Sequence, residues 1–162
     1  DNVAKALNFD EAGMKKVTLE LGGNDPMIVL KDADIDKVIK GVINGAFLNA
    51  GQVCMGVKRI IIDESIADEF VQKLVVATEK LVMGNPQDSK TTLGTLISEK
   101  AAIQVEQAVN DAVEKGAKIL TGGNREDAFY EATVIDNVSP EAFLLLFIYF
   151  SAYLSTTGMV IL

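Results

Sequence analysis

The chain of 162 residues contains no histidine and only one cysteine. Without histidine it cannot form a Ser-His-Asp triad, a histidine general base or a histidine-ligated zinc site. A single cysteine excludes an internal disulfide, and it favours a reducing, cytoplasmic compartment. Any catalysis would therefore have to come from cysteine, carboxylate, lysine or hydroxyl groups.

Basic residues are also scarce, because 15 Lys and Arg stand against 23 Asp and Glu and give a formal net charge of −8 at pH 7. We expect no nucleic-acid partner, since binding along phosphates needs clustered Lys and Arg. Residues 1–5 are polar and include neither an initiator methionine nor the start of an apolar signal region. These features predict an internal fragment of a longer chain.

Short apolar runs alternate with amphipathic stretches along the sequence. Strands are predicted at residues 27–30, 59–63, 117–120 and 132–135. Helices are predicted from Asp32 or Asp34 to Phe47, from Ser65 to Leu81, and from Ser98 to Gly116. The spacing of Ser65 and Asp68 indicates a capping box at the start of the second helix. This order of elements predicts an α/β fold with three layers and a largely parallel sheet.

The C-terminal residues 142–162 differ from the rest because they carry no charge. As a helix they would be roughly 31 Å long, which is enough to cross a bilayer. Three interpretations remain open: a membrane anchor, a buried strand and helix of the same domain, or a tail read out of frame. No Lys or Arg follows Arg125 to provide the usual flanking charge, so we do not expect a membrane partner.

Cys54 is a candidate nucleophile, because it lies between Gly51 and Gly56 in the loop that joins a predicted helix to a predicted strand. Glycines let the backbone approach a substrate closely and can aim an N–H group at a developing oxyanion. A thiolate attacks carbonyl carbon well once its pKa is lowered from about 8.5. The alternative is that Cys54 is a small buried core residue, as many lone cysteines are.

Glu20 is a candidate general base, because it is a single charge within the apolar, strand-like run from Thr18 to Leu21, and this run immediately precedes Gly22 and Gly23. Removal from water would raise the pKa of such a carboxyl and let it activate a water molecule. The alternative is that Glu20 faces outward from a strand, on the same side as Thr18.

Nucleotide-binding loops find no support in the sequence. Residues 51–58 resemble a G-x-x-x-x-G-K phosphate loop, but Lys58 is one position late and no Ser or Thr follows it. No G-x-G-x-x-G fingerprint occurs anywhere in the chain. We therefore expect neither a phosphate loop nor a dinucleotide fingerprint within these residues.

Two motifs together resemble the aldehyde dehydrogenase superfamily. They are Glu20-Leu21-Gly22-Gly23 and, 34 residues after the glutamate, Cys54 within Gly51-Gln52-Val53-Cys54. Weaker landmarks follow in the expected order, namely Gly84-Asn85-Pro86, Gly94-Thr95-Leu96 and Gly116-Ala117-Lys118. The resemblance runs from about Gly13 to Val138 and is closest in style to the microbial lactaldehyde and non-phosphorylating glyceraldehyde-3-phosphate dehydrogenases.

The resemblance implies oxidation of a small aldehyde to a carboxylic acid with NAD or NADP. Cys54 would attack the aldehyde, and Glu20 would activate the water that hydrolyses the resulting thioester. Leu21 and Gly22 match positions beside the nicotinamide in this family. Asn49 and Gln52 match positions near the nucleophile and are expected to support it.

The resemblance also implies that this is an incomplete catalytic domain. Residues 1–22 would be the end of the cofactor-binding domain and its link, 23–140 a catalytic-domain fragment, and 141–162 an apolar tail. After Val138 the family has Glu-x-Phe-Gly-Pro, whereas this chain continues with Pro140-Glu141-Ala142. We expect either a homo-oligomer or association with a full-length homologue, because missing layers leave core surface exposed. The alternative function is a non-catalytic remnant that docks onto an intact relative.

Overall fold

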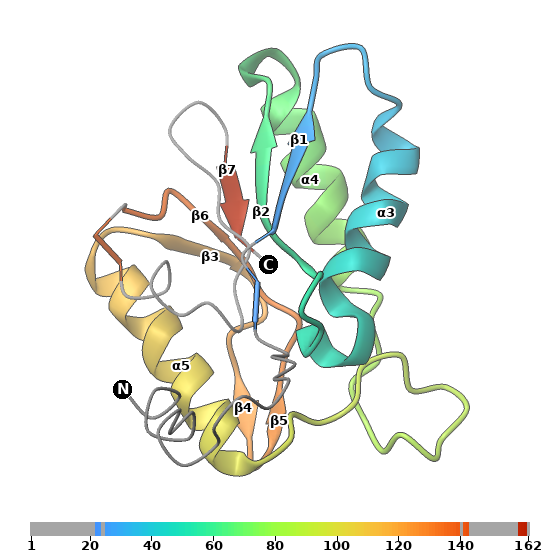
Figure 1. Ribbon diagram of the computed structural model, residues 1–162, viewed down its shortest axis with the longest axis vertical. Coiled ribbons are helices and arrows are strands. Elements are labelled where there is room, and N and C mark those ends of the chain that lie inside the picture. The colour runs from blue at the N-terminus through green and yellow to red at the C-terminus, as the bar shows by residue number, and fades with distance from the viewer. Residues whose placement is uncertain (1–21, 24, 140, 143–158, 162) are drawn as a thin grey trace, which may run out of the picture.

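A computed structural model of the chain describes residues 22–23, 25–139, 141–142 and 159–161 (Figure 1). Its helices are α3 (Ile35–Phe47), α4 (Ala67–Thr78) and α5 (Glu99–Glu114), with short 3₁₀ helices η1 (Leu48–Gly51) and η2 (Glu64–Ile66). Its strands are β1 (Asp25–Val29), β2 (Val57–Ile62), β3 (Lys118–Thr121), β4 (Arg125–Glu126), β5 (Phe129–Tyr130), β6 (Val134–Asp136) and β7 (Met159–Ile161). This mixture confirms the predicted α/β class.

The main sheet has the strand order β1-β2-β7-β6-β3. Strands β1 and β2 are parallel, because helix α3 carries the chain back between them. The other three pairs are antiparallel: β2 with β7, β7 with β6, and β6 with β3. Within the described residues the sheet is therefore mixed, which differs from the largely parallel sheet that the sequence predicts. Two of the antiparallel pairs arise because β7, from near the C-terminus, is inserted between β2 and β6, and the third joins β3 to β6.

Helices cover both faces of this sheet. Side chains of successive strand residues point to opposite faces of the sheet. The contacts of the neighbours Val134 and Ile135 in β6 therefore show which helices pack on each face. Val134 belongs to a buried cluster with Phe70 and Leu74 of α4, which also includes residues of α3. Ile135 packs instead in the cluster of α5, around Ala112. Helices α3 and α4 thus form one outer layer and α5 the other, as the predicted three-layer arrangement requires.

Helix α3 forms where the sequence predicts it. Its apolar residues recur at helical spacing, and Ile39, Val42, Ala46 and Phe47 are buried. Asp34 is the N-cap, because its side chain accepts a hydrogen bond from the Lys37 backbone N–H at 3.2 Å. The open choice between Asp32 and Asp34 is therefore settled in favour of Asp34.

The start of helix α4 differs from the predicted capping box. Asp63 accepts hydrogen bonds from both the N–H and the hydroxyl of Ser65, at 3.0 and 2.6 Å. Because Ser65 is engaged in this way, a 3₁₀ turn forms over Glu64–Ile66, and α4 begins only at Ala67 without a side-chain cap. The helix also ends at Thr78, short of the predicted Leu81.

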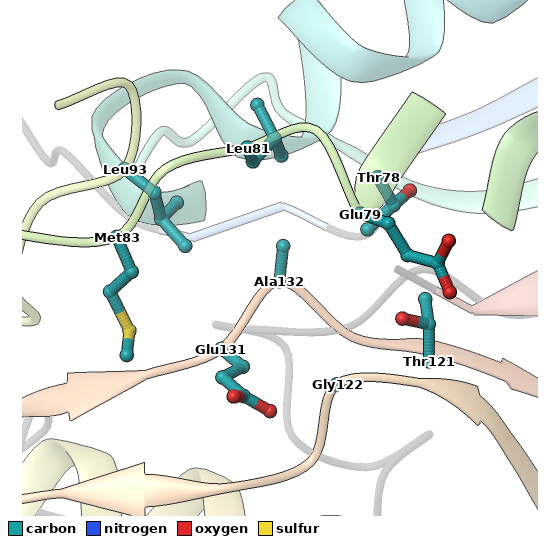
Figure 2. Close-up of a pocket in the computed structure, with 9 residues that line it drawn as sticks. All are labelled: Thr78, Glu79, Leu81, Met83, Leu93, Thr121, Gly122, Glu131 and Ala132. Carbon is teal, nitrogen blue, oxygen red and sulfur yellow. The ribbon is translucent and has the colours of Figure 1, made fainter. Parts of the chain in front are cut away.

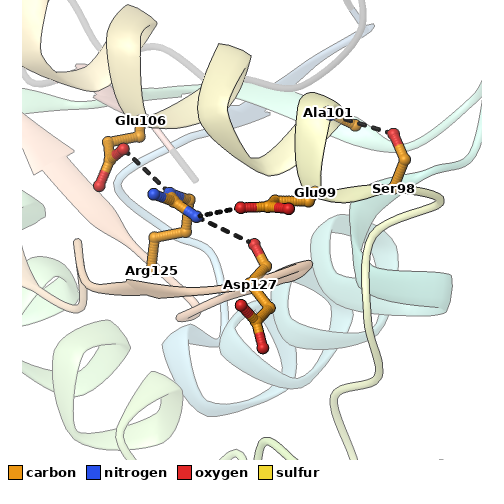
Figure 3. A network of polar contacts seen from close by, with 6 residues as sticks. All are labelled: Ser98, Glu99, Ala101, Glu106, Arg125 and Asp127. Atoms are coloured by element: carbon orange, nitrogen blue, oxygen red, sulfur yellow. Dashed lines mark hydrogen bonds and ion pairs between the residues drawn. The ribbon is translucent and has the colours of Figure 1, made fainter.

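Helix α5 is fixed at its beginning and along one side (Figure 3). The Ser98 hydroxyl accepts a hydrogen bond from the Ala101 N–H at 3.2 Å and caps the helix where the sequence predicts its start. Arg125 of the β4–β5 hairpin reaches across to Glu106 and Glu99 of α5, with N–O distances of 3.0 and 3.7 Å. The hairpin, which the sequence does not predict, is thereby tied to the helix.

The C-terminal tail lies mostly outside the described residues. Within residues 142–162 the structure describes Ala142, which is buried, and Met159–Ile161, which form strand β7 of the main sheet. Of the three interpretations of the tail, this placement matches a strand of the same domain. No helix in the described part of the chain is long and apolar enough to span a membrane.

Candidate functional site

Cys54 lies in a turn between η1 and β2, and its side chain is exposed. The structure therefore excludes the alternative of a buried core cysteine. Helix α3 delivers the chain to this turn, and β2 carries it away along the sheet. No described residue accepts a hydrogen bond from the Cys54 backbone N–H. A backbone N–H is the kind of group that can stabilise a developing oxyanion.

The backbone before Cys54 adopts an uncommon conformation. Three successive residues have positive φ angles: 52° at Asn49, 54° at Ala50 and 74° at Gly51. Asparagine and glycine tolerate this left-handed region, whereas alanine does so at a cost. Residues held in such conformations persist only where the surroundings fix them, and they concentrate at functional sites. Contacts with surrounding residues are therefore needed to hold this loop in place.

Gln52 provides one such contact. Its side-chain amide donates to the carbonyl of Asn49 at 3.0 Å and to that of Thr95 at 3.3 Å. Its side-chain oxygen accepts a hydrogen bond from the Ile97 N–H at 2.8 Å. Gln52 thus joins the cysteine loop, residues 48–56, to a segment more than 40 residues later in the sequence. This is the kind of support that the resemblance implies for Asn49 and Gln52.

The second motif meets the cysteine loop through its last glycine. A Cβ added at Gly23 would overlap the carbonyl oxygen of Cys54 and lie 3.5 Å from its carbonyl carbon. The backbones of these two residues, 31 positions apart, are therefore in direct contact. Gly22 is partly buried beside them. Glu20 and Leu21 lie outside the described residues, so the sequence-based interpretation of these two stands as a prediction.

Lys58 belongs to the same site but is absent from the sequence-based candidates. Its side chain is only 4% exposed, and its Nζ donates to the carbonyls of Gly51 and Val53 at 3.1 and 3.0 Å. Burial lowers the pKa of Lys58, while Asp25 and Cys54 oppose that shift. The signal was present in the sequence: strand alternation places Lys58 on the same face of β2 as Ile60 and Ile62, which are buried.

A second hollow within the described part of the chain is not lined by the residues around Cys54. A cavity of about 370 Å³ lies between the end of α4 and the β3–β4 connection (Figure 2). Two of its polar side chains already have partners, since the Thr78 hydroxyl donates to the Leu74 carbonyl and Glu131 accepts from Asn124. Among the described residues no group of three or more His, Cys, Asp or Glu side chains could hold a metal ion.

Comparison with known proteins places this geometry in context. The model of the aldehyde dehydrogenase family matches residues 2–146. A lactaldehyde dehydrogenase of Methanococcus aeolicus is 46% identical over 126 residues, which are 78% of this chain and 27% of that protein. A 3-sulfolactaldehyde dehydrogenase of Priestia aryabhattai is 49% identical over 131 residues, which are 81% of this chain and 28% of that protein.

A solved structure agrees with these sequences. The glyceraldehyde-3-phosphate dehydrogenase GapN of Methanocaldococcus jannaschii, complexed with NADP, superposes with a TM-score of 0.81 and 44% sequence identity. The match covers 89% of this chain and 31% of that one. The chain thus spans about a quarter of the length of the curated relatives it matches.

Proposed function

Since this chain belongs to the aldehyde dehydrogenase family, we propose that it is the cysteine-bearing part of an enzyme that oxidises an aldehyde to a carboxylic acid with NAD or NADP. The single observation that carries the proposal is the contact between the Gly23 backbone and the Cys54 carbonyl. It brings the end of the Glu-Leu-Gly-Gly segment against the loop of the exposed thiol. Neither motif alone would specify this chemistry.

Cys54 acts as the nucleophile in this proposal. Its thiolate attacks the carbonyl carbon of the aldehyde and forms a thiohemiacetal. The negative charge that develops on the former carbonyl oxygen is stabilised by the Cys54 backbone N–H, which no described residue occupies. Holding the loop rigid keeps the sulfur and this N–H in a fixed relation, so little reorganisation is needed during the reaction.

Glu20 completes the cycle by removing a proton from the water that attacks the thioester and releases the acid. A bound NAD or NADP would supply the hydride acceptor that this oxidation needs. Leu21 and Gly22 are the residues of this chain that would lie against the nicotinamide. The described geometry fits this role, because Gly22 and Gly23 interpose no side chain between that segment and the cysteine loop.

The proposed substrate is a small aldehyde, in keeping with the lactaldehyde and 3-sulfolactaldehyde dehydrogenases among the relatives. The proposed partner is a second copy of this chain or a full-length homologue. Ile28, Leu30 and Met55 are 65%, 62% and 75% exposed, which is apolar surface that such a partner could cover. We place the protein in the cytoplasm, because a free, exposed Cys54 is best maintained where thiols stay reduced.

The test is acetylation of the full chain by p-nitrophenyl acetate, followed by intact mass measurement. This reaction needs no cofactor, so it reports on Cys54 alone. We expect one acetyl group on wild type, none on Cys54→Ala, and slower loss of the acetyl group in Glu20→Gln. If folded wild type gains no acetyl group, or if Cys54→Ala gains it equally, the catalytic proposal is refuted.

The rival function is a non-catalytic module that binds an intact relative. The observation that favours it is that three large apolar residues are exposed: Ile28 in β1, Leu30 directly after it, and Met55 in the cysteine loop. Size-exclusion chromatography with and without a full-length homologue tests it. Co-elution without acetylation at Cys54 would support the rival over the enzyme, whereas separate elution would eliminate it.

A further inference from the structure

Lys58 is a buried cation whose hydrogen bonds are directed at the cysteine loop. An ammonium group removed from water is costly unless polar groups surround it. Here two of its three donors are used by the Gly51 and Val53 carbonyls, at 3.1 and 3.0 Å. Both acceptors lie in the few residues that precede Cys54, so the side chain closes the loop back onto the start of β2.

The surrounding backbone leaves room for this ammonium. A Cβ added at Gly56 would lie 2.6 Å from Lys58 Nζ and 3.2 Å from the Val53 carbonyl oxygen. Gly56 itself is buried. A glycine at this position is therefore what allows the Lys58 side chain to reach the loop carbonyls.

The Lys58 ammonium is also close to Cys54, because it is bonded to the Val53 carbonyl of the peptide that leads into Cys54. Burial, which disfavours the ammonium, is the main influence on its pKa and lowers it, whereas the Asp25 carboxylate and the Cys54 thiolate favour the charged form. Attraction between two groups is mutual, so a cation that the thiolate stabilises also stabilises the thiolate. The charged groups that raise the pKa of Lys58 are Asp25 of β1 and Cys54 of the loop.

We propose that Lys58 is a positioning residue for the Cys54 nucleophile: its buried ammonium holds the Gly51–Val53 backbone and supplies the positive charge that favours the thiolate. This inference rests on the proposed function only in taking Cys54 as the reacting group. A purely structural lysine would hold the loop in the same way but would leave the acidity of the thiol unchanged. That difference can be measured.

The experiment follows alkylation of Cys54 by iodoacetamide from about pH 5 to about pH 10 on the full chain, with intact mass as the readout. Wild type is compared with Lys58→Met, which removes the charge, and with Lys58→Arg, which keeps it. Lys118→Met is the matched control, because it removes an exposed lysine from β3, at the far edge of the sheet from β1. Circular dichroism verifies that each protein is folded.

Lys58→Met is expected to slow alkylation at neutral pH and to move the pH midpoint upward, because the charge that favours the thiolate is removed. Lys58→Arg should keep a midpoint near that of wild type, even though its larger head group lowers thermal stability. Lys118→Met should match wild type in both respects. Equal midpoints in wild type and folded Lys58→Met would overturn the proposal.

Gly56→Ala provides a second route should Lys58→Met fail to fold. The added methyl group displaces the ammonium without removing it, so the midpoint should rise in the same direction, and an unchanged midpoint would again contradict the proposal. The outcome is separable from that of the acetylation test, because alkylation needs neither aldehyde nor water activation. A shifted midpoint with no acetylation would retain the role of Lys58 and refute the enzyme proposal.

Discussion

The contact between Gly23 and Cys54 makes Gly23→Ala an informative perturbation. The substitution adds one methyl group, which would meet the Cys54 carbonyl oxygen and approach the Asp25 carboxylate to 2.7 Å. Asp25 is exposed and can rotate away. The Cys54 carbonyl is part of the backbone, so the overlap can be relieved only by moving the loop or the Gly23 segment. Gly23 has no positive φ, and the effect is therefore purely steric.

The expected cost follows from overpacking a close backbone contact. Such insertions destabilise proteins by about 1–3 kcal/mol. For a chain of this size that corresponds to a fall of roughly 3–10 °C in the melting temperature. A displacement of about 1 Å in a catalytic group can lower a rate about a hundredfold, so acetylation of Cys54 should fall more steeply than stability does.

The assays are thermal unfolding and the rate of Cys54 acetylation, each measured beside Gly41→Ala. Gly41 is an exposed helical glycine of α3, and no atom lies within 4 Å of the position its Cβ would take. Gly41→Ala should therefore stabilise the chain by about 0.5–1 kcal/mol and leave acetylation unchanged. If Gly23→Ala melts like wild type and acetylates at the same rate, the two motifs do not touch as described.

Three further substitutions test individual interactions. Tyr130→Phe removes a buried hydroxyl that has no hydrogen-bond partner in the part of the chain that the structure describes, so it should raise the free energy of unfolding in urea by about 1 kcal/mol; a decrease would mean that the hydroxyl is bonded. Ser98→Ala removes the N-cap of α5 and should lower the same quantity by about 1 kcal/mol, whereas no change would show that the cap is dispensable. The Lys37 side chain and N–H lower the pKa of Asp34, so that carboxylate contributes stability above about pH 4 that is lost as the pH falls through its folded pKa. Asp34→Asn keeps a capping side chain, so its melting temperature should lie below that of wild type at neutral pH and converge with it in acid; a constant difference would contradict this account.

Helix α3 and the cysteine loop were accessible to sequence reasoning for different reasons. The helix is set by local physics, because its apolar spacing and its Asp34 cap act within one segment. The loop could be located by its glycines and by Cys54. Its left-handed conformation at Asn49 and Ala50 could not, because alanine has no intrinsic preference for that region and the tertiary contacts impose it.

The sequence-based errors arise where two local signals compete. Ser65 fits a capping box, but Asp63 binds its N–H and hydroxyl first, and the chain enters a 3₁₀ turn. The position of β7 was out of reach for another reason. A strand near the C-terminus that pairs between β2 and β6 is a long-range choice, which no local pattern encodes.

The cysteine loop combines local strain with contacts from three directions. Gly23 lies against Cys54, Gln52 is bonded to the segment around Thr95, and the Lys58 ammonium binds two loop carbonyls. A strained backbone persists only where surrounding contacts hold it in place. We therefore expect the left-handed conformation of the loop to depend on these contacts. These contacts come from residues 23–97 of the chain itself, whereas the related lactaldehyde dehydrogenase, of which 27% is matched, contains much that this chain does not match. We therefore expect this chain to retain the reactions that need only the Cys54 thiol. Substitution of Gly23, Gln52 or Lys58 should change the rates of these reactions more than addition of a cofactor does.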